Sequence, residues 1–130
     1  MTRIATSWIF INSIFYIGLG VYTIVWPEKL AAAISISLNS PGAIAEIKAS
    51  YGGLMFILGV MMILLYLKQP ISHPLAFIAL LYLGFGVGRL IGIIGEHAYD
   101  RTTLIFSAVE ISSFVISVIL YYILNPLKSQ

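Results

Sequence analysis

The sequence predicts an all-α, polytopic membrane protein in which four transmembrane helices form a bundle. Two features of its 130 residues point to this class: 60% are hydrophobic and only 9% are charged, and four long segments are almost free of charge. A water-soluble domain carries about a quarter charged residues, and a helix needs about 20 mostly apolar residues to cross a bilayer. The segments are continuously apolar rather than alternating, which argues against a transmembrane β-barrel.

The expected spans belong to a single transmembrane domain covering residues 1–130. The apolar run of the first span is longer than the core of a signal peptide, so we expect this helix to be retained. Ser40-Pro41 is typical of an N-cap followed by a first helical residue, so the second helix should begin near Pro41. The four spans are expected at about residues 4–25, 43–67, 74–95 and 102–124.

The connection between the first two spans, residues 27–40, is half apolar. Pro27-Glu28 suits a helix start, and a helix here would be interfacial or re-entrant. Residues 34–39 alternate between apolar and polar, which also suits an extended segment. We expect the short interfacial helix and keep the extended segment as the alternative.

The two halves of the chain resemble each other. Residues 16–21 read Tyr-Ile-Gly-Leu-Gly-Val and residues 82–87 read Tyr-Leu-Gly-Phe-Gly-Val. A duplication would make each half one helical hairpin, related by an axis along the membrane normal. The alternative is chance recurrence in a glycine-rich apolar sequence.

Composition also limits the chemistry. The chain has no cysteine, which excludes disulfides, thiolate metal sites and cysteine catalysis. A net charge of +2 is too small for phosphate tracking, so we expect no nucleic-acid partner. His73 and His97 fall in loops on opposite sides of the expected bundle. We therefore expect no metal and no cofactor, and the lack of a known catalytic motif weighs against an enzyme.

Charged side chains inside the spans are the strongest functional signal. Arg89 and Glu110 should lie about 9 and 12 Å from the same end of the bundle, at 1.5 Å per residue, and Glu46 enters from that end. A lone charge near the centre of a span costs about 2.5–3.5 kcal/mol, so these groups need partners. We expect Glu110 to pair with Arg89, with Glu46 as a second carboxylate on the same guanidinium.

Each expected helix also carries one polar stripe when residues are placed 100° apart. Together the stripes predict a polar pocket centred on Arg89 and open to one side. A structural salt bridge that fixes helix register is the alternative. The candidate ligand-binding residues from this pattern are Arg89, Glu110, Glu46, Ser107, Ser113 and Asn12.

Two ridges of small residues predict close helix packing. Their contacts could lie within one chain or between the copies of a homo-oligomer, a dimer or larger. The candidate packing residues are Gly84, Gly88, Gly92 and Gly95 in the third span, and Ala45, Ala49 and Gly53 in the second.

Residues 45–53, Ala-Glu-Ile-Lys-Ala-Ser-Tyr-Gly-Gly, the Gly88-Arg89 pair and the late Glu110 form a pattern. This pattern resembles a bacterial family of small four-helix membrane proteins of unknown function, over most of the chain. Lys48 stands where the family usually has Arg, which keeps the charge but weakens bidentate binding. The resemblance implies functional roles for Glu46, Lys48, Tyr51, Gly52, Gly53, Arg89 and Glu110, without an activity. The architecture is also loosely similar to DoxX-type proteins, as a fold analogy.

The leading functional hypothesis is a membrane protein that binds or transports a small anionic or amphipathic ligand in this pocket. The alternatives are a structural or accessory membrane subunit, a lipid- or quinone-modifying enzyme, and an oligomeric channel. We expect a bacterial inner-membrane location. Both termini are assigned to the cytoplasm, although the Lys and Arg counts barely decide: Arg3, Lys68 and Lys128 on the terminal side against Lys29, Lys48 and Arg101.

Overall fold

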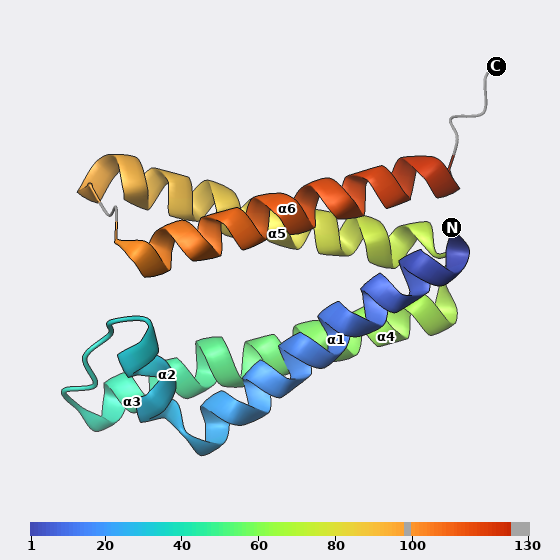
Figure 1. Cartoon of the computed structure of the whole chain (residues 1–130). Coiled ribbons are helices and arrows are strands. Elements are labelled where there is room, and N and C mark those ends of the chain that lie inside the picture. Colours follow the sequence, from blue (N-terminus) through green and yellow to red (C-terminus); the bar gives the residue numbers. More distant parts are fainter. Residues whose placement is uncertain (98–99, 126–130) are drawn as a thin grey trace. The chain divides into compact units, whose positions relative to one another are not determined.

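The computed structural model describes residues 1–97 and 100–125, and the regular structure in this part of the chain is helical (Figure 1). A π-helical segment, η1, joins two α-helices without a break, so α3, η1 and α4 form one continuous helix and the described residues contain five helices. The elements are α1 (Thr2–Val25), α2 (Pro27–Ala33), α3 (Pro41–Ile47), η1 (Lys48–Gly53), α4 (Leu54–Lys68), α5 (Ser72–Glu96) and α6 (Arg101–Leu124).

Four of these helices are long and apolar enough to cross a membrane. Each end lies within two residues of its expected position, because prolines and charged residues bracket the apolar runs. This agreement confirms the predicted all-helical class with four candidate membrane spans. The four span helices are Thr2–Val25, Pro41–Lys68, Ser72–Glu96 and Arg101–Leu124.

Side-chain caps explain where two of the helices begin. The Ser40 hydroxyl accepts a hydrogen bond from the Ala43 amide at 3.1 Å, directly before Pro41, which confirms the predicted start of the second span. Asp100 caps α6 in the same way, because its carboxylate accepts bonds from the Thr103 amide at 3.0 Å and the Thr103 hydroxyl at 2.5 Å. Hydrogen bonds from Thr103 lower the pKa of the Asp100 carboxyl below its ordinary value.

The connection after the first span contains the expected short helix, α2. It begins at Pro27 and ends before Ser35, whose φ of 59° is left-handed. Residues 36–39 then continue without regular structure, so the extended alternative is not adopted as a strand. Lys29 Nζ lies 5.3 Å from the Trp26 ring centre, a cation–π contact at the start of this helix. Its interfacial location stays a prediction.

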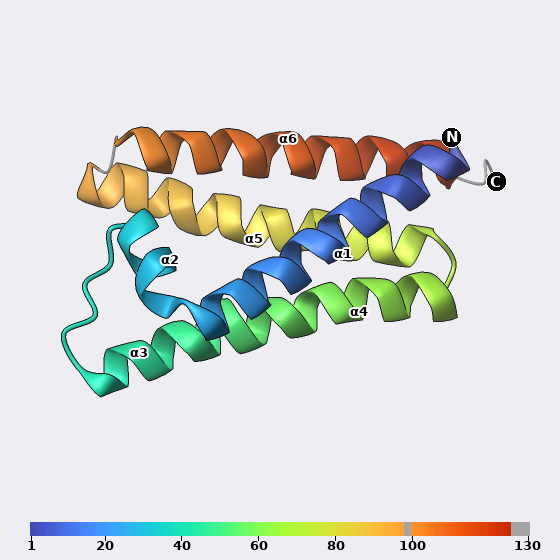
Figure 2. The ribbon, with the colours of Figure 1, turned by 60° about the horizontal axis from the view of Figure 1, so that its bottom comes forward.

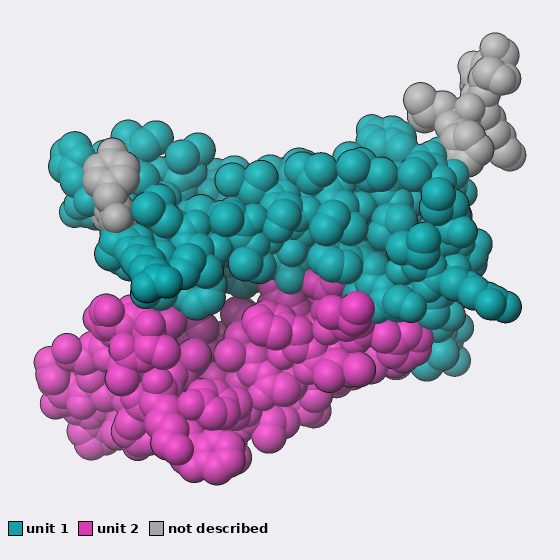
Figure 3. All heavy atoms as spheres, viewed as in Figure 1, with its two compact units in different colours: residues 1–9, 65–130 teal, residues 10–64 magenta. Residues whose placement is uncertain are grey.

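The described chain divides into two compact units, shown in different colours in Figure 3: residues 1–9 with 65–130, and residues 10–64. In the first unit, α5 and α6 run antiparallel and lie side by side along their length (Figures 1 and 2). The start of α1 joins this unit, since Trp8 Nε1 donates to the Ser117 hydroxyl of α6 at 2.9 Å. The prediction of a single domain stays untested by this division.

In the second unit, α1 crosses the continuous second helix at three glycines. A Cβ on Gly20 would lie 2.6 Å from the Phe56 amide nitrogen, and one on Gly59 would lie 2.7 Å from the Ser13 carbonyl oxygen. A Cβ on Gly52 would lie 2.7 Å from the Ile24 side chain. Backbones approach this closely only where a side chain is missing, which is how small residues let membrane helices associate.

Candidate functional site

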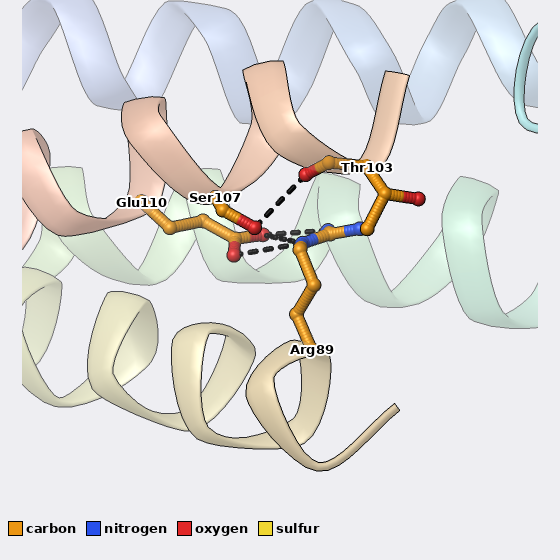
Figure 4. A network of polar contacts seen from close by, with 4 residues as sticks. All are labelled: Arg89, Thr103, Ser107 and Glu110. Carbon is orange, nitrogen blue, oxygen red and sulfur yellow. Dashed lines mark hydrogen bonds and ion pairs between the residues drawn. The ribbon is translucent and has the colours of Figure 1, made fainter. Parts of the chain in front are cut away.

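The centre of the candidate site is a bidentate ion pair between α5 and α6 (Figure 4). Arg89 Nη2 lies 2.6 Å from Glu110 Oε1, and Arg89 Nε donates to Oε1 at 3.0 Å and to Oε2 at 2.9 Å. The side chain of Glu110 is 8% exposed and that of Arg89 is 29% exposed. The predicted pairing of Arg89 with Glu110 is therefore present, in the fork geometry that only Arg provides.

Neighbouring side chains of α6 lie beside this pair. The Phe106 ring centre lies 5.2 Å from the Arg89 guanidinium carbon, a cation–π contact on its flank. Ser107 lies one turn before Glu110 and donates its hydroxyl hydrogen to the Thr103 carbonyl at 2.9 Å. Figure 4 shows Ser107 beside the carboxylate, so the pair and this hydroxyl share one region.

A pocket of about 230 Å³ lies between α5 and α6, with Glu110 in its wall. Most of its lining is aliphatic or aromatic, and α6 contributes the polar residues Glu110 and Ser107. An apolar pocket with a few placed polar groups is the usual form of a small-molecule site. The lining residues are Tyr82, Leu83, Gly86, Val87, Leu90, Ile93, Ser107, Glu110, Ile111 and Phe114.

The polar stripe predicted on the fourth span continues beyond the ion pair. Ser113 and Ser117 are both buried, and the Ser117 hydroxyl donates to the Ser113 carbonyl at 2.8 Å. Ser117 also accepts the Trp8 bond, so its hydroxyl is used as donor and acceptor. Asn12 of α1 is buried as well, in the second unit. Its part in a ligand site stays a prediction.

The remaining predicted ligand residues lie on α3 and η1 of the second unit. Glu46 and Lys48 are exposed and Tyr51 is half-buried. Lys48 and Tyr51 belong to the π-helical segment, a backbone form that is common at functional sites. Arg89 and Glu110 belong to the other unit. That these residues join them in one pocket therefore stays a prediction.

The glycine ridge predicted on the third span is open in the single chain. A Cβ on Gly84, Gly88, Gly92 or Gly95 would meet nothing within 4 Å among the described residues. Gly53 in the second ridge has only a 3.9 Å neighbour, the Lys48 carbonyl of its own helix. Helix packing by these two ridges stays a prediction, and the same holds for Ala45 and Ala49. A structure of a homo-oligomer would test it.

Sequence reasoning missed two of the glycines at the helix crossing, Gly20 and Gly59, and reached Gly52 only through the family resemblance. A signal was present, since Gly52 and Gly59 are seven residues apart and so share one helix face. The sequence predicted close packing at the ridge on α5 instead, because its glycines recur every four residues. Among residues 1–97 and 100–125, no group of three His, Asp or Glu side chains is placed to hold a metal ion.

Comparison with known proteins gives a family but no function. The chain belongs to the family described as a domain of unknown function (DUF4345), which matches residues 4–121. No curated protein and no solved structure matches the chain. The predicted membership of a family of unknown function is confirmed, while the bacterial source and the residue pattern quoted for that family stay predictions.

Proposed function

We propose that this member of the family is an integral membrane protein that binds or transports a small amphipathic or anionic molecule at the pocket between α5 and α6. One observation carries the proposal: Glu110, the buried acid of the Arg89–Glu110 ion pair, is one of the residues that line the pocket. Ionisable groups inside a span are expensive, and where they border a cavity they mark ligand or ion sites. The aliphatic lining would hold the apolar part of the ligand, and Glu110 with Ser107 would meet its polar end.

The size of the pocket favours a lipid-like ligand. Pockets that enclose most of a drug-sized molecule measure about 300–1,000 Å³, whereas this one measures about 230 Å³. It would therefore enclose one arm of a ligand rather than a whole one. A molecule already dissolved in the bilayer can leave the rest of its apolar surface in lipid, which a water-soluble ligand cannot do.

A structural role is the second candidate, and the completeness of the ion pair supports it. Both oxygens of Glu110 accept bonds from Arg89, an arrangement that repays much of the cost of burying the two charges. Such a pair can fix the register of two helices without binding anything. The protein would then be a structural or accessory membrane subunit.

Exchanging Arg89 for Lys separates the two candidates. Lys keeps the positive charge that Glu110 needs, but it loses the planar fork that fixes the position of the Glu110 side chain, which lines the pocket. If the pocket binds a ligand, native mass spectrometry of purified wild type should show a bound small molecule or lipid, and Arg89→Lys should lose it with little change in melting temperature. The matched control is Arg101→Lys, an exposed arginine at the start of α6, which should retain the bound species.

Two results would favour the structural role instead. One is a wild-type protein with no bound species, combined with a melting temperature that falls in Arg89→Lys. The other is a bound species that Arg89→Lys and Arg101→Lys retain equally. In both cases the ion pair acts on helix packing and not on a ligand.

We infer a bacterial inner-membrane location with both termini in the cytoplasm, and a homo-oligomer as the transporting form. The orientation rests on the Lys and Arg counts, of which Lys128 lies outside the described residues. The oligomer would use the open ridge that contains Gly88. Because the chain has no cysteine, single cysteines introduced at Thr2 and Glu28 can be labelled from each side to test the orientation.

A further inference from the structure

We propose that the pocket between α5 and α6 selects a neutral amphiphile whose polar end donates a hydrogen bond, an alcohol or phenol, rather than an ion. This inference rests on the proposed function and names the chemical class of its ligand. It follows from counting which hydrogen-bonding positions of the polar lining residues are already used.

Glu110 has acceptor capacity left on one oxygen. Oε1 accepts from both Nε and Nη2 of Arg89, whereas Oε2 accepts only from Nε. A carboxylate offers about four lone-pair positions, two on each oxygen. Nε carries a single hydrogen that the two oxygens share, so Oε2 receives only part of one bond and keeps a position for a further donor. Glu110 is one of the residues that line the pocket.

Ser107, the other polar residue that α6 contributes to the lining, also offers an acceptor. Its hydrogen is given to the Thr103 carbonyl, and a hydroxyl oxygen retains two lone pairs when it donates. The third polar lining residue, Tyr82 of α5, already makes a contact of its own. A ligand that brings a donor would satisfy Oε2 or the Ser107 oxygen, whereas a ligand that brings only acceptors would face them unpaired.

The charge of the site excludes ions by a separate argument. Arg89 and Glu110 carry no net charge as a pair, and they are the charged groups that face each other across the two helices that form the pocket. An added anion or cation would bring one uncompensated charge into an apolar lining, which is costly inside a membrane. A neutral donor adds a hydrogen bond to a charged acceptor without that cost.

Four probes with the same ten-carbon chain test the inference: 1-decanol, decyl methyl ether, decanesulfonate and decylammonium. The ether keeps the apolar arm and the oxygen of the alcohol but has no donor. Saturable binding is measured for wild-type protein in lipid nanodiscs, with empty nanodiscs as the correction for partition into lipid. A hydrogen bond to a charged group predicts that decanol binds on the order of tenfold or more tightly than the ether, and more tightly than either ion.

Two variants locate the effect. Leu90→Trp places a larger side chain in the lining and should abolish saturable binding of decanol and ether alike. Ser107→Ala removes one acceptor and should weaken decanol without changing the ether. Because the comparison of the four probes uses the wild-type protein, its outcome does not depend on whether either variant folds.

Each other outcome overturns the inference in a distinguishable way. Equal affinity for decanol and the ether would refute selection of a donor while leaving an amphiphile pocket in place. Tightest binding of decanesulfonate or decylammonium would refute neutrality, and the sulfonate result would leave the anionic form of the proposed function standing. If no probe binds above empty nanodiscs, the proposed function fails together with the inference.

Discussion

Removing the carboxylate of Glu110 alone should destabilise the protein more than removing the whole ion pair. Glu110→Leu removes the charge-assisted contacts that Arg89 makes through two nitrogens, Nε and Nη2, at 2.6 to 3.0 Å. Breaking a buried pair costs about 3–5 kcal/mol, because the charge that remains loses its oppositely charged partner. The Arg89 side chain is 29% exposed and long enough to turn towards a more polar region, so we expect the lower end, about 3 kcal/mol.

The double variant Arg89→Leu with Glu110→Leu should lose less stability than this single variant. It removes the ion pair and leaves apolar surfaces of similar volume, a change that is often neutral or stabilising. The assay is thermal unfolding in one mild detergent for wild type, both single variants and the double variant. Glu96→Leu is the control, because Glu96 is exposed at the end of α5 and its loss should change stability by no more than about 0.5 kcal/mol.

The order of melting temperatures decides the result. Glu110→Leu below the double variant, with Glu96→Leu near wild type, supports a buried and mutually dependent pair. If Glu110→Leu and the double variant melt together, Arg89 does not need Glu110 and the reasoning from burial is refuted. A single variant that melts like wild type would refute it as well.

The other predictions concern a helix crossing and a helix cap. Gly20→Ala should lower the free energy of unfolding by about 1–3 kcal/mol, because its Cβ would lie 2.6 Å from a backbone nitrogen. Gly18→Ala on the same helix is the control, because its Cβ would meet nothing within 4 Å. Equal melting temperatures of the two variants in detergent would contradict the crossing. The bonds from Thr103 lower the pKa of Asp100 from 3.8, so its cap should stabilise α6 fully above that pH and be lost as the pH falls through the lower folded value. In an NMR titration, the chemical shift of the Thr103 amide should change at the pH where Asp100 is protonated, and Asp100→Asn should abolish this change. A midpoint at or above pH 3.8 in wild type would count against the cap.

Features that depend on one segment of sequence could be predicted well. The span ends follow from where charged residues and prolines interrupt apolar runs, and the cap at Ser40 follows from the proline after it. The pairing of Arg89 with Glu110 could be predicted because each is the only charged residue well inside its expected span. A charge inside a membrane span needs a partner of opposite charge, and Glu110 is the residue that can supply it for Arg89.

Features that depend on packing between segments could not be predicted. The polar stripes predicted a polar pocket centred on Arg89, whereas the lining of the pocket between α5 and α6 is mostly apolar and includes Glu110 but not Arg89. Its shape depends on how the aliphatic side chains of the two helices pack, which no residue pattern specifies. The similar strings at residues 16–21 and 82–87 illustrate the limit. Gly20 in the first string is a tight helix contact, whereas its counterpart Gly86 lines the pocket and has nothing within 4 Å of its Cβ position.

The π-helical segment interrupts the α-helical periodicity of the second span. An unbroken α-helix would place Glu46, Ser50 and Gly53 on one face, but η1 covers Lys48–Gly53 and has more residues per turn. Side chains after η1 are therefore rotated relative to those before it, so one face of α3 does not continue as the same face of α4. The π-helical backbone coincides with the Tyr51-Gly52-Gly53 stretch that the family resemblance implies to be functional. A Cβ on Gly52 would lie 2.7 Å from the Ile24 side chain of α1, so this segment packs closely on that helix. The geometry of this segment, rather than α-helical periodicity, decides the directions in which its side chains point.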